Sequence, residues 1–235
     1  MLDLSEAFHA ALRLIASLDP QLVEIIGLSL QVTLSAVAIA ALIGFTLGGT
    51  LAVYRFPGRG FLAALLNALM GLPPVVAGLA VYLLLSTAGP LGVLQILYTP
   101  QAMIIAQVIL VTPIVAALAR QTCEDLLEEY REQLRSLGAS SSAIVMTLLW
   151  DGRYRLVTAV LAGFGRGIAE VGAVMIVGGN IDHVTRTMTT AIALETSKGN
   201  ISLALALGMI LLAIAIAINV ALMGIRRIAS HFAYA

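Results

Sequence analysis

Charged residues and cysteine are both scarce in this chain. Asp, Glu, Lys and Arg make up 11% of its 235 residues, and 60% are hydrophobic. Soluble domains carry roughly 25% charged residues. The 13 basic residues balance the 13 acidic ones, so no basic surface for nucleic acid is expected. Cys123 is the only cysteine, which excludes an intrachain disulfide and a cysteine metal cluster. The composition predicts an integral membrane protein.

Catalytic patterns are missing as well. The three histidines, His9, His183 and His231, lie outside the long apolar runs, and no His-Glu-x-x-His motif occurs. The chain also lacks the loop G-x-x-x-x-G-K-[ST], which cradles nucleotide phosphates. We therefore expect a chain that is not an enzyme, has no cofactor of its own and cannot hydrolyse ATP itself.

Long runs without Asp, Glu, Lys or Arg predict the membrane crossings. They cover residues 25–54, 60–119 and 199–225, and a crossing helix needs about 20 apolar residues. The second run holds two crossings, and the segment from residue 156 forms another despite Arg166 and Glu170. The predicted fold class is all-α, a polytopic membrane protein. Its five transmembrane helices are expected at about residues 25–54, 61–86, 101–120, 156–178 and 200–225.

Lys and Arg are distributed unevenly between the segments that connect these crossings. Basic residues favour the cytoplasmic segments of membrane proteins. With the charged segment around residues 123–152 in the cytoplasm, nine basic residues lie inside and three outside, and Arg166 lies within a crossing. The inner residues are Arg55, Arg59, Arg120, Arg131, Arg135, Arg153, Arg155, Arg226 and Arg227, and the outer ones are Arg13, Arg186 and Lys198. The N-terminus is predicted outside and the C-terminus in the cytoplasm.

Residues 1–22 have a pattern of their own. Their apolar side chains recur at helical spacing, which predicts an amphipathic helix at the outer interface. These side chains are Leu2, Leu4, Phe8, Leu12, Ile15 and Leu18. Anchoring is the favoured role, and a functional role stays open. Residues 23–228 are expected to form one transmembrane domain.

Glycines recur at a spacing of four within two of the crossings. The pairs are Gly44 with Gly48, and Gly163 with Gly167. Small residues at this spacing let helix backbones approach closely in lipid. We expect both pairs to be packing sites.

The segment at residues 123–152 is a charged island in an apolar chain. It begins with a helix whose apolar stripe consists of Leu126, Leu127, Tyr130, Leu134 and Leu137. Gly138 suits the left-handed end of that helix, and the serines from Ser140 onward suit the start of a second one. Such a helix can press its stripe into a partner's groove, so the island predicts a docking surface for a soluble partner. An interfacial helix without a partner is the alternative.

This island resembles the cytoplasmic loop of ABC importer permeases. That loop follows the pattern E-A-A, three residues, G, nine residues, I-x-L-P. Here Glu132-Gln133-Leu134 precedes Gly138 by three residues, and nine more lead to Leu148-Leu149-Trp150-Asp151. The Glu-to-Gly spacing and the following Ala139 and Ser140 agree with the family, whereas Gln133, Leu134 and Asp151 do not.

Other segments resemble the molybdate- and tungstate-type permeases of that family. They are Gly71-Leu-Pro-Pro-Val-Val-Ala-Gly78, residues 87–107, residues 165–181 and residues 183–200. The segment from His183 to Asn200 is most similar to tungstate permeases. The resemblance covers about residues 23–228, nearly the whole chain.

The resemblance implies a type I importer permease fold and a set of partners. These are a second copy of the chain, a cytoplasmic ATP-binding subunit that uses the ATP, an extracytoplasmic substrate-binding protein and membrane lipid. The expected location is the prokaryotic plasma (inner) membrane. The loop, here a coupling helix and its turn, is expected to dock on the ATP-binding subunit. The docking candidates are Glu128, Glu129, Glu132, Leu134, Gly138, Ala139 and Ser140.

Two charges inside a crossing are candidates for the pathway or its gate. A charge at a helix centre costs about 2.5–3.5 kcal/mol. Arg166 and Glu170 are spaced i,i+4, so they can neutralise each other on one helix face. A structural or gating pair is favoured over direct contact of Arg166 with an anion.

Prolines and uncharged polar groups complete the candidates. Pro73 and Pro74, followed by Gly78, remove backbone donors in mid-crossing, which predicts a kink that lines the pathway or serves packing alone. Asn180 and Thr187 lie in the outer segment after the fourth crossing, where the other hydroxyls are Thr185, Thr189 and Thr190. They line an outer mouth or gate, or they belong to a solvated loop.

Other functions stay open. A permease for molybdate, or for another small solute such as sulfate, has the same kind of loop. A stand-alone secondary carrier usually has carboxylates at mid-membrane, and here only Glu170 qualifies. Tungstate and molybdate are tetrahedral dianions of nearly equal size, so physical reasoning from the sequence does not separate them.

Overall fold

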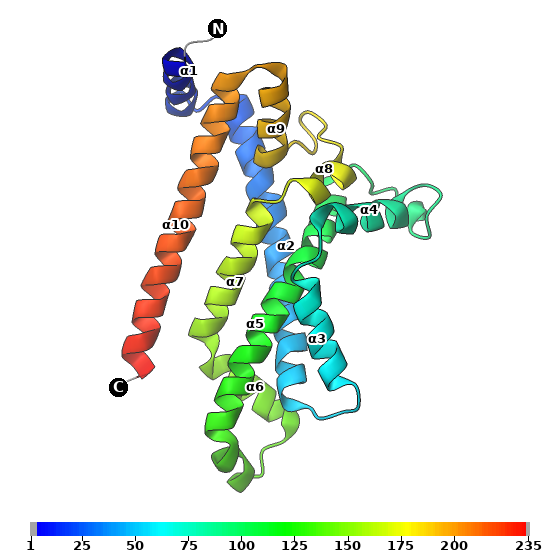
Figure 1. The fold of residues 1–235 in the computed structure, drawn as a ribbon, viewed down its shortest axis with the longest axis vertical. Helices are drawn as coiled ribbons and strands as arrows, with labels where there is room; N and C mark the ends of the chain where they lie inside the picture. The colour runs from blue at the N-terminus through cyan, green and yellow to red at the C-terminus, as the bar shows by residue number, and fades with distance from the viewer. Residues whose placement is uncertain (1–3, 234–235) are drawn as a thin grey trace. The chain divides into compact units, whose positions relative to one another are not determined.

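The protein is described from a computed structural model that covers residues 4–233, whose regular structure is helical. Figure 1 shows the arrangement of the helices. In chain order they are α1 (Leu4–Ala16), α2 (Pro20–Val53), α3 (Arg59–Leu69), α4 (Pro74–Leu85), the 3-10 helix η1 (Gly92–Leu94), α5 (Pro100–Ser136), α6 (Ser141–Asp151), α7 (Arg153–Ile168), α8 (Gly172–Gly178), α9 (Met188–Lys198) and α10 (Ile201–Ala233).

Three of these helices are long and apolar enough to cross a membrane. They are α2, α5 over Pro100–Leu134 and α10 over Ile201–Ala221. Two pairs of shorter helices, α3 with α4 and α7 with α8, meet the same test only when each pair counts as one span. The described residues therefore hold three to five membrane spans, which confirms the predicted all-α, polytopic fold class.

The second predicted crossing is broken. Helix α3 ends at Leu69 and helix α4 begins at Pro74, with Pro73 as its N-cap in an extended conformation. Proline is well suited to the first turn of a helix, where its missing N–H would have no intrahelical acceptor. The kink predicted at Pro73 and Pro74 is a complete break, because the two prolines start a new helix.

The fourth predicted crossing is broken too. Helix α7 ends at Ile168 and α8 begins at Gly172, so Glu170 lies in the break. The expectation that Arg166 and Glu170 share one helix face is therefore wrong. Helix α9 lies in the segment between the fourth and fifth predicted crossings, for which no helix was predicted.

The chain divides into two compact units. The first comprises Met1–Ser35, Pro73–Gln107 and Gly167–Ile218, and the second comprises Ala36–Leu72, Val108–Arg166 and Asn219–Ala235. The division at Ala36 lies within α2, and the division at Val108 lies within α5.

In the first unit, the later halves of the two broken pairs pack together. Figure 1 shows α4 and α8 side by side. A Cβ atom on Gly78 would lie 2.7 Å from the Cα atom of Ala173, and one on Gly172 would lie 2.9 Å from Val75 Cγ2. Each glycine thus removes the side chain that would hold the two helices apart.

In the second unit, α2 and α5 approach each other through small residues. A Cβ atom on Gly44 would lie 2.9 Å from Val115 Cβ. One on Gly48 would lie 2.5 Å from the Ala116 carbonyl oxygen. In the same unit α7 packs on α5 in this way too, since a Cβ atom on Gly163 of α7 would lie 2.8 Å from Val111 Cγ1. These contacts confirm the predicted packing role of Gly44, Gly48 and Gly163.

We expect Gly48→Ala to destabilise the protein. The added methyl group meets backbone atoms of α5, the Ala116 oxygen at 2.5 Å and the Arg120 nitrogen at 2.7 Å. Overpacking of this kind costs about 1–3 kcal/mol, so the midpoint of thermal unfolding in detergent should fall. Gly27→Ala in the same helix is the control, since nothing lies within 4 Å of its added Cβ atom. Equal midpoints for the two variants would contradict the close packing of α2 on α5.

Candidate functional site

The turn between α5 and α6 has the geometry that the sequence predicts. Gly138 has a φ of +62° in the left-handed region, and Ala139 N donates to the Leu134 carbonyl oxygen at 3.2 Å. This bond closes the end of α5 in the way a C-terminal glycine allows. Ser140 then caps α6, accepting a hydrogen bond from Ala143 N at 3.4 Å. The local structure holds the docking candidates at a defined turn.

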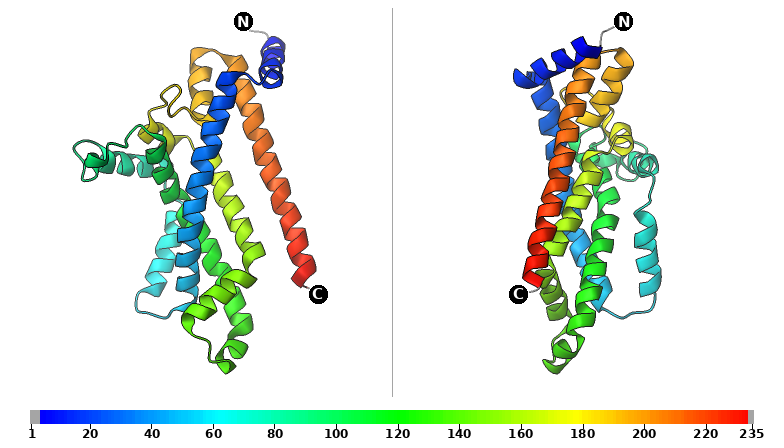
Figure 2. Two further views of the ribbon diagram at one scale, coloured as in Figure 1. Left: turned by 180° about the vertical axis from the view of Figure 1, so that it is seen from behind. Right: turned by 60° about the vertical axis from the view of Figure 1, so that its left-hand side comes forward.

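The apolar stripe on the last turns of α5 packs mainly against the chain itself. Leu126 is buried in one cluster with Cys123, Leu148 of α6 and Ala52 of α2, and Leu127 and Tyr130 pack against this cluster. Figure 2 shows α6 beside the last part of α5. The expectation that the whole stripe enters a partner's groove is therefore wrong, because its first half already has a partner. Leu137, by contrast, is 79% exposed.

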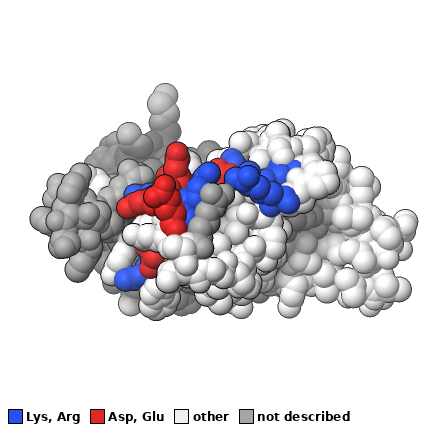
Figure 3. Space-filling model, turned by 90° about the horizontal axis from the view of Figure 1, so that it is seen from below, with Lys and Arg blue, Asp and Glu red and all other residues white. Residues whose placement is uncertain are grey.

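The exposed side of this segment is acidic. Glu128, Glu129 and Glu132 are exposed on α5, and Gly138 and Ser140 are exposed in the turn. Figure 3 shows acidic side chains gathered in one patch, with basic side chains next to it. A surface of this kind is complementary to a basic patch on another protein.

A cluster of two arginines and one glutamate lies at the base of the segment. Glu124 Oε1 receives hydrogen bonds from an Arg59 nitrogen at 2.7 Å and from Arg120 at 3.0 Å. Arg59 also donates to the carbonyl oxygens of Leu51 at 2.5 Å and Ala52 at 3.3 Å. Its guanidinium thus satisfies acceptors at the end of α2, where a positive charge is favourable. The cluster ties α2, α3 and α5 together.

The sequence interpretation missed this cluster. It used Arg59 and Arg120 only as markers of topology. The unpaired carbonyl groups at the end of a helix cannot be matched with a distant arginine from sequence spacing alone. The signal available was the position of Glu124, the first acidic residue after a long uncharged run.

The threonines between the end of α8 and the first turn of α9 form a buried network in the first unit. Thr185, Thr187, Thr189 and Thr190 are all buried, so the interpretation as a solvated loop is wrong. Thr187 is the N-cap of α9, and its N–H donates to Thr190 Oγ1 at 3.0 Å. Thr185 Oγ1 donates to the Gly178 carbonyl oxygen at 2.5 Å and accepts from Ile181 N at 2.9 Å. Asn180 follows the end of α8 with a φ of +52°.

The buried carboxylate of Glu170 supports the break between α7 and α8. Its Oε1 accepts a hydrogen bond from Ala173 N at 2.9 Å, in the first turn of α8. Its backbone oxygen accepts from Thr189 Oγ1 at 2.7 Å. Glu170 and Thr187 also line one small cavity together. Three further residues of this cavity, Ser29, Thr33 and Gln107, were not singled out, although each is a polar residue within an uncharged apolar run.

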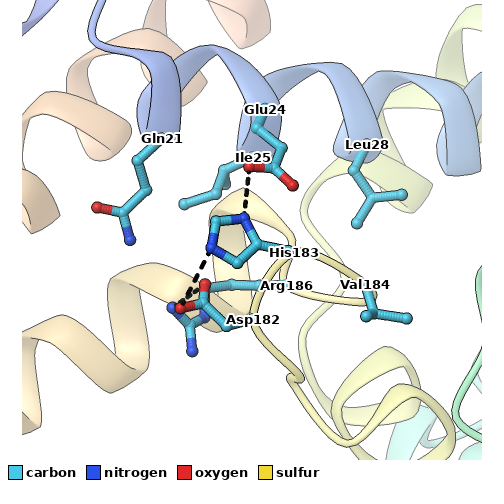
Figure 4. Close-up of a pocket in the computed structure, with 8 residues that line it drawn as sticks. All are labelled: Gln21, Glu24, Ile25, Leu28, Asp182, His183, Val184 and Arg186. Atoms are coloured by element: carbon cyan, nitrogen blue, oxygen red, sulfur yellow. Dashed lines mark hydrogen bonds and ion pairs between the residues drawn. The ribbon is translucent and has the colours of Figure 1, made fainter.

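A second pocket lies between α2 and the segment from Asp182 to Arg186. In Figure 4 the His183 ring lies between Glu24 and Asp182. Its Nδ1 is 2.8 Å from Glu24 Oε2 and its Nε2 is 3.9 Å from Asp182 Oδ2, while Arg186 pairs with Asp182 at 2.6 Å. The hydrogen bond to Glu24 and the charges of Glu24 and Asp182 raise the pKa of His183, against smaller opposing effects of desolvation and of the Arg186 charge.

The raised pKa makes the stabilisation from the contact between His183 and Glu24 depend on pH. A histidine whose pKa is raised in the folded state contributes its full stabilisation below the ordinary value of 6.5, and loses it as the pH rises through the raised value. We expect the thermal midpoint to fall over that pH window, and His183→Gln to remove this part of the pH dependence. His9→Gln is the control, because His9 lies on α1, and it should keep the wild-type profile. If His183→Gln kept the wild-type dependence of the thermal midpoint on pH, the contact of His183 with Glu24 would not stabilise the protein.

No family model matches this chain. Individual proteins that are similar to it place it in a family. The permease protein TupB of a tungstate uptake system from Peptoclostridium acidaminophilum is 41% identical over 84% of this chain and 86% of the relative. A probable anion ABC transporter permease protein from Haloferax volcanii is 40% identical over 77% of this chain and 80% of the relative. The sulfate permease protein CysW from Synechocystis is 30% identical over 81% and 72%.

Fold and similarity together identify the class of protein. The helices define a multi-pass membrane protein. The chain belongs to the permease proteins of ABC transporters. Such a subunit is a transport component and not the ATPase of the complex.

Proposed function

We propose that this chain is the membrane subunit of an ABC importer that takes up tungstate. The observation that carries the substrate is the 41% identity, over 84% of this chain, to a permease protein of a tungstate uptake system. The sulfate permease protein is less similar, at 30% identity. Molybdate has nearly the same shape and charge as tungstate and is the first alternative, ahead of sulfate, another small solute or a secondary carrier.

The complex contains two copies of this chain, a cytoplasmic ATP-binding subunit and an extracytoplasmic substrate-binding protein. The lack of a phosphate-binding loop in the chain supports the need for a separate ATP-binding subunit. The nine-to-three distribution of Lys and Arg supports an external N-terminus and a cytoplasmic C-terminus in the prokaryotic plasma (inner) membrane. The domain boundaries, with residues 1–22 as an interfacial helix and residues 23–228 as the transmembrane domain, are part of the same proposal.

The turn between α5 and α6 docks on the ATP-binding subunit. Its exposed acidic residues, Glu128, Glu129 and Glu132, offer a charged contact surface. The buried cluster around Leu126 and Leu148 supports a rigid connection between this turn and the helices. Leu134, Gly138, Ala139 and Ser140 set the shape of the turn. Movement of the partner on ATP binding is thereby passed to α5 as a whole.

The two helix breaks contribute to the pathway or its gate. Pro73, Pro74 and Gly78 belong to the break before α4, and Glu170 belongs to the break before α8. The candidate set also includes Arg166 in the last turn of α7, and Asn180 and Thr187 before α9. Neutral hydroxyl and amide groups suit an oxyanion in transit, since their hydrogen bonds are weaker than charge-assisted ones and release it readily.

Competition between oxyanions tests the substrate. Vesicles that contain the permease, its ATP-binding subunit and its binding protein should accumulate tungstate when ATP is supplied. We expect unlabelled sulfate to compete at least about tenfold less effectively than unlabelled tungstate, a difference of about 1.4 kcal/mol. Sulfate that competes as well as tungstate would contradict the assignment of tungstate as the substrate. Preferential uptake of molybdate would make molybdate the substrate instead.

Substitutions in the turn test the docking surface. Glu132→Lys reverses a charge in the acidic patch, and Gly138→Pro is incompatible with the φ of +62°, because proline fixes φ near −65°. We expect either variant to reduce uptake per ATP hydrolysed severalfold, while the dimer still inserts. Glu6→Lys on α1 is the control for the charge change and should transport normally. Normal coupling in both turn variants would refute the docking role.

A further inference from the structure

An apolar groove in the second unit lies where α6 leads into α7. Its volume is about 420 Å³, within the range of about 300–1,000 Å³ that is usual for ligand pockets. Three helices contribute to its lining: Phe45 comes from α2, Met146 and Trp150 from α6, and Arg153, Val157 and Val160 from α7. Arg153 is the one charged residue among the described lining residues. The groove is therefore large enough for part of a ligand that is mostly apolar.

The groove has a charged end and an apolar end. Arg153, Val157 and Val160 are spaced i, i+4 and i+7 along α7, so they share one face of this helix. Arg153 is the first residue of α7, and the two valines lie farther along the helix toward α8. With a rise of 1.5 Å per residue, Arg153 and Val160 are separated by about 10 Å along the axis. The groove thus begins at a positive charge and continues along apolar side chains.

Aromatic rings hold the guanidinium group of Arg153, and no acidic side chain neutralises it. Its Cζ atom lies 5.1 Å from the centre of the Trp150 ring and 4.8 Å from that of the Tyr154 ring, both within cation–π range. Its Nη1 atom donates to the Trp150 carbonyl oxygen at 2.9 Å. Among the side chains that the structure describes, no carboxylate pairs with Arg153, whereas Arg155 lies 3.6 Å from an Asp125 oxygen. Most of the five N–H groups of Arg153 therefore stay available to an anion.

The walls of the groove are exposed, while its floor is packed. Met146 and Trp150 are 72% and 69% exposed, although both side chains are large and apolar, and Leu156 on the floor is 5% exposed. Leu149, another lining residue, packs against the buried cluster around Leu148. A packed floor keeps the shape of the groove, and the exposed walls leave apolar surface to be covered. Tryptophan, tyrosine and arginine at the end of a membrane helix are typical of the level of the lipid headgroups.

A phospholipid matches both ends of the groove in one molecule. Its phosphate is an anion that a guanidinium group binds with two N–H groups, and its acyl chain covers apolar surface. Basic residues beside pockets between membrane helices bind anionic headgroups on the cytoplasmic side. The described lining residues include no Asp or Glu to pair with the cationic group of a zwitterionic headgroup. A helix from a second protein would cover the apolar walls but would need a carboxylate opposite Arg153. Charge and shape therefore favour an anionic lipid.

We propose that this groove binds an anionic phospholipid such as phosphatidylglycerol. The phosphate lies on Arg153, and one acyl chain follows Val157 and Val160. The lipid contacts α2, α6 and α7 together, so it stabilises the position of α6, the helix that follows the turn at Gly138. The site goes beyond the proposed function, from which it takes only the side of the membrane, and it depends on neither the oxyanion nor the ATP-binding subunit.

Fluorescence of Trp150 tests this site directly, because Trp150 is the only tryptophan in the chain. The full-length permease is reconstituted in vesicles of phosphatidylcholine with a minor amount of phosphatidylglycerol, without oxyanion, ATP or other proteins. In one set the phosphatidylglycerol carries bromine, a quencher of tryptophan, on its acyl chains. In the other set an equal amount of the phosphatidylcholine carries it, so the lipid composition is the same. Quenching is measured relative to vesicles without bromine.

We expect brominated phosphatidylglycerol to reach Trp150 with an affinity about fivefold higher than that of brominated phosphatidylcholine, the effect of roughly one basic residue on an anionic lipid. Equal quenching by the two lipids would mean an unselective contact and would overturn the proposal. Absence of quenching by either lipid would overturn it as well, because a protein surface such as a second copy would then cover the groove.

Matched variants locate the headgroup. Arg153→Gln removes the charge and should abolish the preference for phosphatidylglycerol, whereas Arg153→Lys keeps the charge and should keep part of the preference. Arg155→Gln makes the same change two residues away, at an arginine that faces Asp125, and should keep the full preference. A full preference in Arg153→Gln, or an equal loss in Arg155→Gln, would overturn the assignment. Should Arg153→Gln fail to insert, high salt applied to the wild type decides. The preference should then fall, since salt screens exposed charges, and a preference that salt leaves unchanged would overturn the proposal.

Discussion

Backbone N–H and C=O groups that lie in a membrane without a helical partner must be satisfied by the protein itself. This requirement is strongest at the breaks between α3 and α4 and between α7 and α8. At the second break, Glu170 accepts from Ala173 N, Thr189 donates to the Glu170 carbonyl oxygen and Gln107 donates to the Gly167 carbonyl oxygen. Side chains from distant parts of the sequence thus replace the hydrogen bonds that a continuous helix would supply.

The same requirement explains why polar residues occur in runs that are otherwise apolar. Several hydroxyl and amide groups within the first unit have a defined backbone partner, as Ser29 has in Ile25 and Met188. A broken span can change its shape with less loss of hydrogen bonding than a continuous helix, because its backbone groups are held by side chains. We consider the breaks, rather than the long helices, to be the parts of this permease that are suited to gating.

The second unit uses different means to hold its parts. Glycines such as Gly48 bring α2 and α5 into close contact, and Glu124 holds two arginines at the base of the segment that leads to Gly138. The turn at Gly138 is therefore attached to a firmly packed body. An attachment of this kind transmits the movement of a docked partner, whereas a flexible loop would absorb it.

Hydropathy was sufficient to predict the fold class and the three unbroken spans, because lipid requires long apolar helices. The turn at Gly138 and the cap at Ser140 were also predictable, since both follow from local backbone geometry. The breaks were not, because a hydropathy pattern has no information on where a helix stops, and Pro73–Pro74 was interpreted as a kink. The burial of Leu126 against Leu148 depends on tertiary packing, and helix α9 was hidden by the threonines at its start.

The central claim is that this chain moves an oxyanion only when a separate ATP-binding subunit drives it. The most direct measurement compares tungstate accumulation in vesicles with and without that subunit, while the permease and the binding protein are kept constant. We predict accumulation against a gradient only when the subunit and ATP are both present. Equal accumulation by the permease without the subunit would mean that the chain is a stand-alone carrier, and would contradict the account.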